Sequence, residues 1–264
     1  MLDCGGEKMG EVYVITSGKG GVGKTTAAAN IGIGLSLEGK SVILIDTDIG
    51  LRNLDIAVGL ENEIVYDLVD VVNGDCELKQ AVVVNRNQKG LAVLPAAQTK
   101  NQQAVTGEQM KKLCSELKNI FDYVIIDCPA GVDYGFETAI CAADKAIVVT
   151  TPDLSSMRDA DKAIERLYEM QIEDVKLIIN KIYPKLMGVQ LPYADEVLEY
   201  LRINLLGIIP EDIKLVIASN ASKAVVTDEK SLSGEAFRNI VKRIQGQYVP
   251  IIDFDCKRKI KRFL

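Results

Sequence analysis

Short apolar runs alternate with amphipathic stretches along most of the chain. The apolar runs have the length of strands buried on both faces and lie at residues 12–16, 42–45, 91–94, 123–126, 146–149, 175–179 and 205–209. Helical patterns lie between most of them, including those at residues 25–37, 107–117, 157–170 and 194–201. This alternation predicts an α/β fold with a doubly wound, mostly parallel sheet and helices on both faces.

Composition narrows the class of protein. The chain has 264 residues, 48% of them apolar, and no linker-like stretch, so we expect a single domain over residues 1–253, with residues 1–10 flexible. Histidine is absent, which excludes Ser-His-Asp triads, histidine-containing zinc sites and histidine acid–base catalysis. Scattered cysteines without a signal peptide indicate reduced thiols in a cytoplasmic protein, and no apolar run reaches the length of a membrane span.

The run after the first predicted strand has the pattern of a phosphate-binding loop. It fits G-x-x-x-x-G-K-[ST] and lies between an apolar run and a helical pattern, as that motif requires. Glycines let backbone N–H groups turn toward phosphates, and the start of the helix adds partial positive charge. We expect Lys24 to reach the β- and γ-phosphates of ATP and the Thr25 hydroxyl to bind Mg²⁺. The residues predicted to bind ATP or ADP are Gly18, Lys19, Gly20, Gly21, Val22, Gly23, Lys24, Thr25 and Thr26.

Acidic residues follow two of the predicted strands. Asp46 and Asp48 come after the run at 42–45, and Asp127 follows the run at 123–126. Because the carboxyl ends of parallel strands face the ligand crevice, these acids are candidates for the magnesium site and for the attacking water. The predicted metal set is Thr25, Asp46 and Asp127. A lone aspartate in such a place can also be a helix cap or a turn residue.

A second lysine, Lys19, stands early in the P-loop (residues 18–25), where it cannot easily share the phosphates with Lys24. The chain resembles the deviant Walker A family of P-loop ATPases, and within it the MinD-like proteins, over nearly its whole length. The matching stretches are TSGKGGVGKTT at 16–26, DTDIGLRNLD at 46–55, VYDLVDV at 65–71, LPAAQT at 94–99, DCPAG at 127–131, SSMRDADK at 155–162 and GIIPED at 207–212. Its first ten residues and Cys128 depart from the family pattern.

The resemblance implies a P-loop NTPase fold and Mg²⁺-dependent hydrolysis of ATP to ADP and phosphate. It implies that Lys19 reaches the partner's nucleotide in an ATP-bound homodimer, whereas by itself Lys19 could be a solvated loop residue. It also implies that Asp48 orients the hydrolytic water and that Asp46 and Asp127 lie in the two switch segments. The predicted catalytic set is Lys19, Lys24, Asp46 and Asp48.

Two further groups have an ordinary interpretation and a functional one. Asn180 and the run Pro210, Glu211 and Asp212 follow predicted strands and by sequence alone are turn residues; the resemblance implies that they contact adenine. Ser155, Asp159 and Asp161 begin a predicted helix and by sequence alone are capping and solvated residues. The resemblance implies that they bind a division inhibitor and a topological-specificity regulator of the Min type.

The last residues are basic. The net charge is −6, yet residues 257–264 hold five bases and no acid, so the rest of the chain is more acidic still. Within 254–264, Lys257 and other bases surround Ile260, Phe263 and Leu264, which have helical spacing. The spacing fits either a disordered charged tail or an amphipathic helix. The resemblance implies a membrane-targeting helix on an anionic surface, and hence reversible peripheral binding to the inner face of the cell membrane.

The resemblance implies an ATP-driven switch that positions the division septum. A flagellar-placement ATPase is the nearest alternative, because it too can have a membrane-binding tail. A ParA-like partition ATPase would bind DNA, and the acidic body favours no direct nucleic-acid binding. A nitrogenase-type electron-transfer protein would need cluster cysteines in a glycine-flanked setting, which Cys128 and Cys141 lack.

Overall fold

The sheet confirms the predicted architecture. A computed structural model describes residues 9–183, 186, 192 and 194–252. Within them the strand order is β3-β4-β2-β5-β1-β6-β7-β8, and every pairing is parallel except that of β3 with β4. The strands are β1 (Glu11–Thr16), β2 (Val42–Asp46), β3 (Val83–Val84), β4 (Leu91–Leu94), β5 (Tyr123–Asp127), β6 (Lys145–Thr150), β7 (Val175–Ile182) and β8 (Asn204–Pro210). The antiparallel β3 was not predicted, because a two-residue strand has no periodicity.

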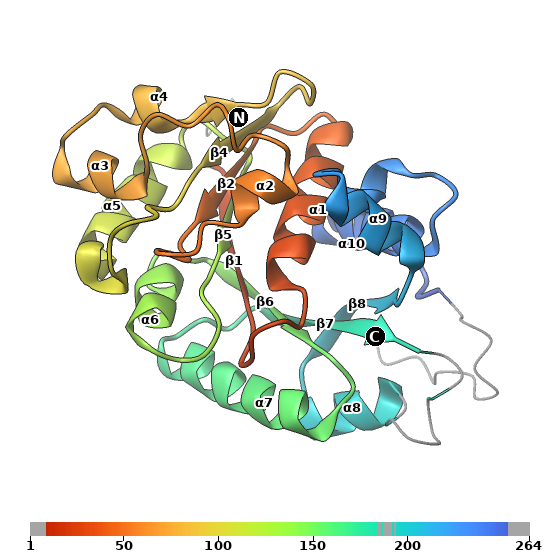
Figure 1. Cartoon of the computed structure of the whole chain (residues 1–264). Coiled ribbons are helices and arrows are strands. Elements are labelled where there is room, and N and C mark those ends of the chain that lie inside the picture. Colours follow the sequence, from red (N-terminus) through yellow and green to blue (C-terminus); the bar gives the residue numbers. More distant parts are fainter. Residues whose placement is uncertain (1–8, 184–185, 187–191, 193, 253–264) are drawn as a thin grey trace, which may run out of the picture.

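Helices cover both faces of this sheet (Figure 1). The α-helices are α1 (Lys24–Leu37), α2 (Leu54–Ala57), α3 (Leu68–Asn73), α4 (Leu78–Ala81), α5 (Gly107–Leu117), α6 (Tyr134–Ile140), α7 (Leu154–Glu169), α8 (Ala194–Leu201), α9 (Ile213–Asn220) and α10 (Leu232–Ile244). Two short 3₁₀ turns, η1 (Gln102–Ala104) and η2 (Val225–Thr227), complete the described elements.

Alternation along the strands divides the core in two. In β1, Val12 and Val14 join the cluster beneath α5, α6, α7 and α8, whereas Tyr13 and Ile15 join the one beneath α1 and α10. Both clusters are almost fully buried because a parallel sheet is covered on both sides. Of the predicted flexible start, Gly10 belongs to the packed body, since it is buried and its N–H donates to the Lys118 carbonyl at 2.9 Å.

The strand ends decide where the polar residues lie. β2 and β5 each run one residue past the predicted end, so Asp46 and Asp127 are the last residues of neighbouring strands and face each other in register. The helix predicted at 157–170 begins earlier, at Leu154, because the Asp153 carboxylate caps it by accepting from the Ser156 N–H at 3.0 Å.

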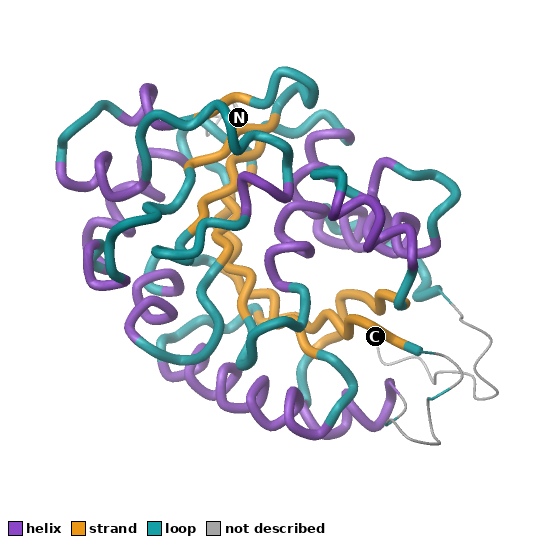
Figure 2. Tube along the Cα trace, in the orientation of Figure 1, coloured by secondary structure: helices purple, strands orange, loops and turns teal. Residues whose placement is uncertain are grey.

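The loops that follow the parallel strands, drawn in teal in Figure 2, lie at one edge of the sheet. This edge holds the P-loop between β1 and α1 and the segments after β2, β5, β6 and β7. The predicted tail, with Lys257, Ile260, Phe263 and Leu264, lies outside the described residues, as do residues 1–8 of the predicted flexible start.

Candidate functional site

The P-loop joins β1 to α1 in the geometry that its sequence predicts. Gly21 and Gly23 have φ of 78° and 98°, values that favour glycine, and Gly23 precedes the first turn of α1. Gly18 is needed for a different reason, since a Cβ there would overlap the backbone of Asp159 on α7. Lys24 and Thr25 therefore start the helix with their side chains at the carboxyl edge of the sheet.

Lys24 and Asp127 form a buried ion pair at the centre of the site. Lys24 Nζ lies 3.2 Å from Asp127 Oδ1, and their side chains are only 8% and 1% exposed. Burial opposes the charge of Lys24, but Asp127, with further contributions from Cys128 and Asp48, outweighs this effect and raises the pKa of the ammonium. Burial also raises the pKa of Asp127, against the effect of Lys24 and of a hydrogen bond from Thr25. The predicted Walker lysine, acid and hydroxyl are thus brought together.

The Asp127 carboxylate and the Thr25 hydroxyl are hard oxygen donors that fit Mg²⁺, which proteins bind through one or two such groups plus phosphate oxygens. Within the described ranges, no cluster of three or more His, Cys, Asp or Glu residues could hold a metal ion by itself. A magnesium site here would therefore need the nucleotide's phosphates to complete it.

Asp46 organises the loop that follows β2. Its fully buried carboxylate accepts from the N–H groups of Asp48 (2.9 Å), Asn53 and Leu54 (both 3.1 Å). Burial raises the pKa of Asp46 to about 7, and the charge of Asp127 adds to this. Burial likewise raises the pKa of Asp48, against the nearby Lys24 charge. Asp46 thus fixes the loop that carries Asp48, while Asp48 stays partly exposed at the site.

The loop after β2 also contains a second set of contacts, which the sequence pattern did not predict. Arg52 has φ of 46°, and its Nε lies 3.0 Å from Asp55 Oδ2. The Gln98 amide is oriented with its oxygen toward Arg52. That oxygen accepts from Arg52 Nε at 3.3 Å and from Nη2 at 3.2 Å. Arg52 and Asp55 both belong to the run GLRNLD at residues 50–55, one of the stretches that carry the family resemblance.

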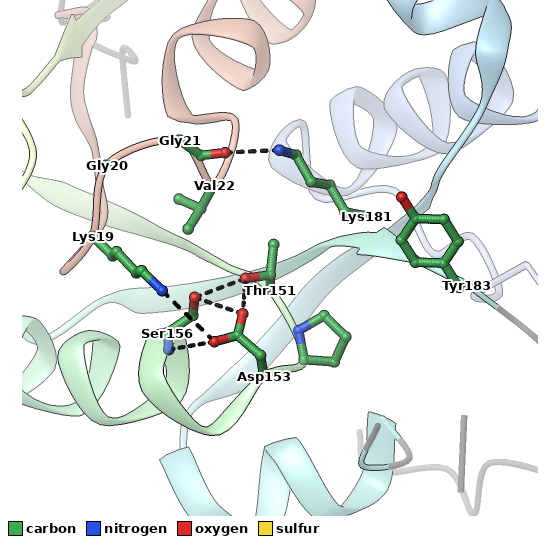
Figure 3. A pocket seen from close by; sticks show the side chains of 10 residues that line it. Lys19, Gly20, Gly21, Val22, Thr151, Asp153, Ser156, Lys181 and Tyr183 are labelled. Atoms are coloured by element: carbon green, nitrogen blue, oxygen red, sulfur yellow. Dashed lines mark hydrogen bonds and ion pairs between the residues drawn. The ribbon is translucent and has the colours of Figure 1, made fainter. Parts of the chain in front are cut away.

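Lys19 contacts its own chain. Its Nζ lies 3.3 Å from Ser155 Oγ. It also lies 3.9 Å from Asp153 Oδ1, a contact that Figure 3 shows. Burial opposes the charge of Asp153, but hydrogen bonds from Thr151 and Ser156 outweigh it and lower the pKa of that carboxyl. Lys19, Thr151, Asp153 and Ser156 are among the residues that line a cavity of about 290 Å³ between the P-loop and the start of α7. Lys19 therefore rests on the start of α7 in the isolated chain.

The residues predicted to contact adenine differ in their burial and in the hydrogen bonds that they already make within the chain. Asn180 is buried against the P-loop, and its Nδ2 donates to the Val22 carbonyl at 2.8 Å. Pro210 is buried at the end of β8, whereas Glu211 is exposed. Asp212 caps α9 through the Lys214 N–H at 2.9 Å and accepts from the hydroxyl of Ser231 at 2.6 Å.

The predicted partner residues lie on the first turns of α7. Ser155 is exposed, Asp159 and Asp161 are partly exposed, and Lys162 Nζ lies 3.6 Å from Asp159 Oδ1. Their surroundings fit the capping and solvated interpretation and also leave them accessible to a partner. In the part of the chain that the structure describes, no helix is both long and apolar enough to cross a bilayer.

Comparison with known proteins adds the family. The family described as AAA domain matches residues 10–182. The septum site-determining protein MinD of Bacillus subtilis is 52% identical over 246 residues, covering 92% of each chain. A MinC:MinD cell division protein complex from Aquifex aeolicus has a TM-score of 0.86 and 41% identity, covering 92% of this chain and 99% of that one. Septum site-determining protein MinD from Pyrococcus horikoshii, complexed with Mg-ADP, has a TM-score of 0.80 and 27% identity, covering 89% and 96%.

Proposed function

Since the chain belongs to the MinD family of septum site-determining P-loop ATPases, we propose that it is an ATP-driven switch for placing the division septum. The observation that carries the proposal is the convergence of Lys24, Thr25 and Asp127 beside Asp48 at the carboxyl edge of the sheet. Curated relatives at 52% and 45% identity are named septum site-determining proteins, which favours this role over flagellar placement or DNA partition.

The substrate is ATP and the cofactor Mg²⁺; the Mg-ADP complex of the Pyrococcus horikoshii relative supports both. The phosphates replace Asp127 as the partner of Lys24, because both compete for the same ammonium group. Thr25 and Asp127 would hold the Mg²⁺ ion, with Asp46 at the next strand end, and the ion would supply charge neutralisation on the phosphates. Asp48 orients the water that attacks the γ-phosphorus; the bond to the bridging oxygen breaks and leaves ADP and phosphate.

Dimerisation couples this site to the rest of the switch. Lys19 leaves Ser155 and Asp153 and reaches the nucleotide of a second copy, so each ATP is held by two chains. The modest contacts that Lys19 makes with its own α7, an exposed hydrogen bond and an ion pair at 3.9 Å, support such a transfer, because exposed contacts of this kind contribute little stability. Hydrolysis removes the γ-phosphate and returns the chain to the monomer.

Binding to partner proteins and to the membrane depends on the dimer. The Aquifex aeolicus complex pairs MinD with MinC, and we assign a division inhibitor of that type, and a topological-specificity regulator, to the start of α7 with Ser155, Asp159 and Asp161. The basic segment 254–264 gives reversible binding to the inner face of the cell membrane. Two tails held in one dimer bind ~10²–10⁴-fold more tightly than one, through effective concentration.

The test is to measure the size of the chain with ADP and with ATP, with and without anionic vesicles. We expect a monomer with ADP, a dimer with ATP, and vesicle binding only in the second case. Asp48→Ala should bind ATP, remain dimeric and hydrolyse little. A chain truncated after residue 255 should dimerise but stay off the vesicles. Normal turnover by Asp48→Ala, or ATP-dependent pelleting of the truncated chain equal to that of the full chain, would contradict the respective assignment.

A further inference from the structure

Two neighbouring side chains at the end of β7 hold two consecutive carbonyl groups of the P-loop. Asn180 Nδ2 donates to the Val22 oxygen at 2.8 Å, and Lys181 Nζ donates to the Gly21 oxygen at 2.8 Å. Figure 3 shows the Lys181 side chain reaching across the cavity to Gly21. Lys181 is absent from the predicted site, and the proposed hydrolysis gives it no role.

Peptide geometry makes these two contacts informative. In a planar trans peptide, the C=O of one residue and the N–H of the next point in opposite directions. The described part of the chain contains no cis peptide bond. Because the Gly21 carbonyl points toward Lys181, the Val22 N–H points away from β7. Because the Val22 carbonyl points toward Asn180, the Gly23 N–H also points away from β7.

Consecutive N–H groups that point to one side of a turn form an anion-binding concavity. Gly21 and Gly23 both have positive φ, and glycine is the residue type with the most conformational freedom, so this part of the loop needs outside contacts to fix it. External contacts to its carbonyl groups are what restrict the peptide planes on either side of Val22. The end of β7 therefore limits how the loop presents its donors.

The two contacts also support each other. Asn180 Oδ1 accepts from the Lys181 N–H at 2.9 Å, and Asn180 is only 4% exposed. Lys181 has φ of 55°, a left-handed conformation that disfavours residues other than glycine and is kept only where the surroundings fix it. A Cβ at Gly23 would overlap the Asn180 amide nitrogen, so the fit between β7 and the loop leaves no space.

We propose that Lys181 is a positioning residue for nucleotide binding: with Asn180, it orients the Val22 and Gly23 N–H groups toward the phosphates. It acts through the Gly21 carbonyl and touches no phosphate itself. The inference rests on the proposed function, because it requires a nucleotide at the P-loop. It names a residue that the phosphate-loop motif does not contain.

Lys181→Met tests this, with Lys181→Arg as the conservative variant. The matched control is Lys176→Met on the same strand, where the lysine makes a peripheral ion pair, 3.7 Å from Asp174. Calorimetry measures the dissociation constants for ADP and for AMP, and steady-state ATP hydrolysis gives kcat and KM. The unfolding midpoint of each variant is measured without nucleotide. Because AMP lacks the β-phosphate, the ratio of ADP to AMP affinity reports on the phosphate loop rather than on the adenine contacts.

We expect Lys181→Met to bind ADP about threefold more weakly, because the lost hydrogen bond is charge-assisted but exposed to solvent. The ADP-to-AMP ratio should fall, KM should rise more than kcat falls, and the unfolding midpoint should match that of Lys176→Met. Lys181→Arg should recover most of the affinity. ADP binding by Lys181→Met as tight as that of the control would overturn the inference, as would equal losses for ADP and AMP. Failure of the unmutated chain to bind ADP would instead refute the proposed function, and this inference with it.

Discussion

The loop after β2 offers the sharpest test of the site, through the change Arg52→Gln. Arg52 pairs with Asp55, whose side chain is 1% exposed, and Arg52 itself is 17% exposed. The Arg52 N–H also donates to the Asp48 carbonyl at 3.2 Å. The ion pair therefore holds a strained residue that bonds directly to the backbone of the proposed hydrolytic aspartate.

The magnitude follows from the burial of the pair. Removing one partner of a buried ion pair costs ~3–5 kcal/mol, and the partial exposure of Arg52 favours the lower end, about 3 kcal/mol. For a chain of this size that corresponds to a fall of roughly 6–12 °C in Tm. Arg52→Gln with Asp55→Asn removes both charges, so the double variant should lose only about 1 kcal/mol. In the single variant kcat should fall more than the affinity for ATP, because the loop carries Asp48 but no P-loop donor.

Urea unfolding of the nucleotide-free chain, followed by circular dichroism, measures this directly. The matched control is Glu169→Gln, which breaks an arginine–carboxylate pair of the same i, i+3 spacing with Arg166 at 2.7 Å, but on an exposed face of α7. That change should leave the free energy of unfolding nearly unchanged, because the pair is exposed to solvent. A loss for Arg52→Gln as small as that of the control would refute the reasoning, as would a double variant no more stable than the single one.

Other parts of the site make further predictions. Asp127→Asn leaves Lys24 buried without its partner and should destabilise the nucleotide-free chain by ~3–5 kcal/mol, whereas Asp144→Asn breaks a more exposed pair and should cost below about 1 kcal/mol in the same unfolding assay. Asp212→Ala removes the cap of α9 and should cost ~1 kcal/mol at neutral pH. Burial opposes the charge of Asp212, but the hydrogen bonds to its carboxylate outweigh this effect and lower its pKa. The stability contributed by the cap is therefore present above about pH 4 and lost as the pH falls further. A stability difference between Asp212→Ala and the unmutated chain that persists at low pH would contradict this. Lys19→Ala should bind ADP normally but dimerise weakly with ATP; unchanged dimers by light scattering would exclude the cross-chain role.

The sequence predicted the sheet and the phosphate site well, for physical reasons. Strands of a parallel sheet are buried on both faces, so they are continuous apolar runs, and the acids that end them stand out. The P-loop is local in sequence, so its glycines, Lys24 and Thr25 can be recognised together. Asp46 and Asp127 were each predicted to face the ligand crevice because each ends a parallel strand, and the register of β2 and β5 places them side by side.

What the sequence did not predict depends on contacts between distant residues. Asn180 was predicted to contact adenine, a role that stays a prediction, but its bond to Val22 spans 158 positions and has no local pattern. The same holds for Lys181 and Gly21, and for Arg52 and Gln98. The helices α2, α3 and α4 have four to six residues, too few for periodicity to show. Sequence identified the residue types, and packing decided which pairs of them meet.

The close fit of Gly18 against α7 has a consequence beyond the choice of glycine. Backbone atoms of the P-loop and of Asp159 are in direct contact, so even a small displacement of the loop must be transmitted to the helix, because packed interiors do not compress. Further along α7, Arg166 is ion-paired with Glu137 of α6. The outer surface of α7 should therefore move together with the phosphate site. A fluorescent label on its exposed turns would report the nucleotide state from outside the site, without touching the bound nucleotide.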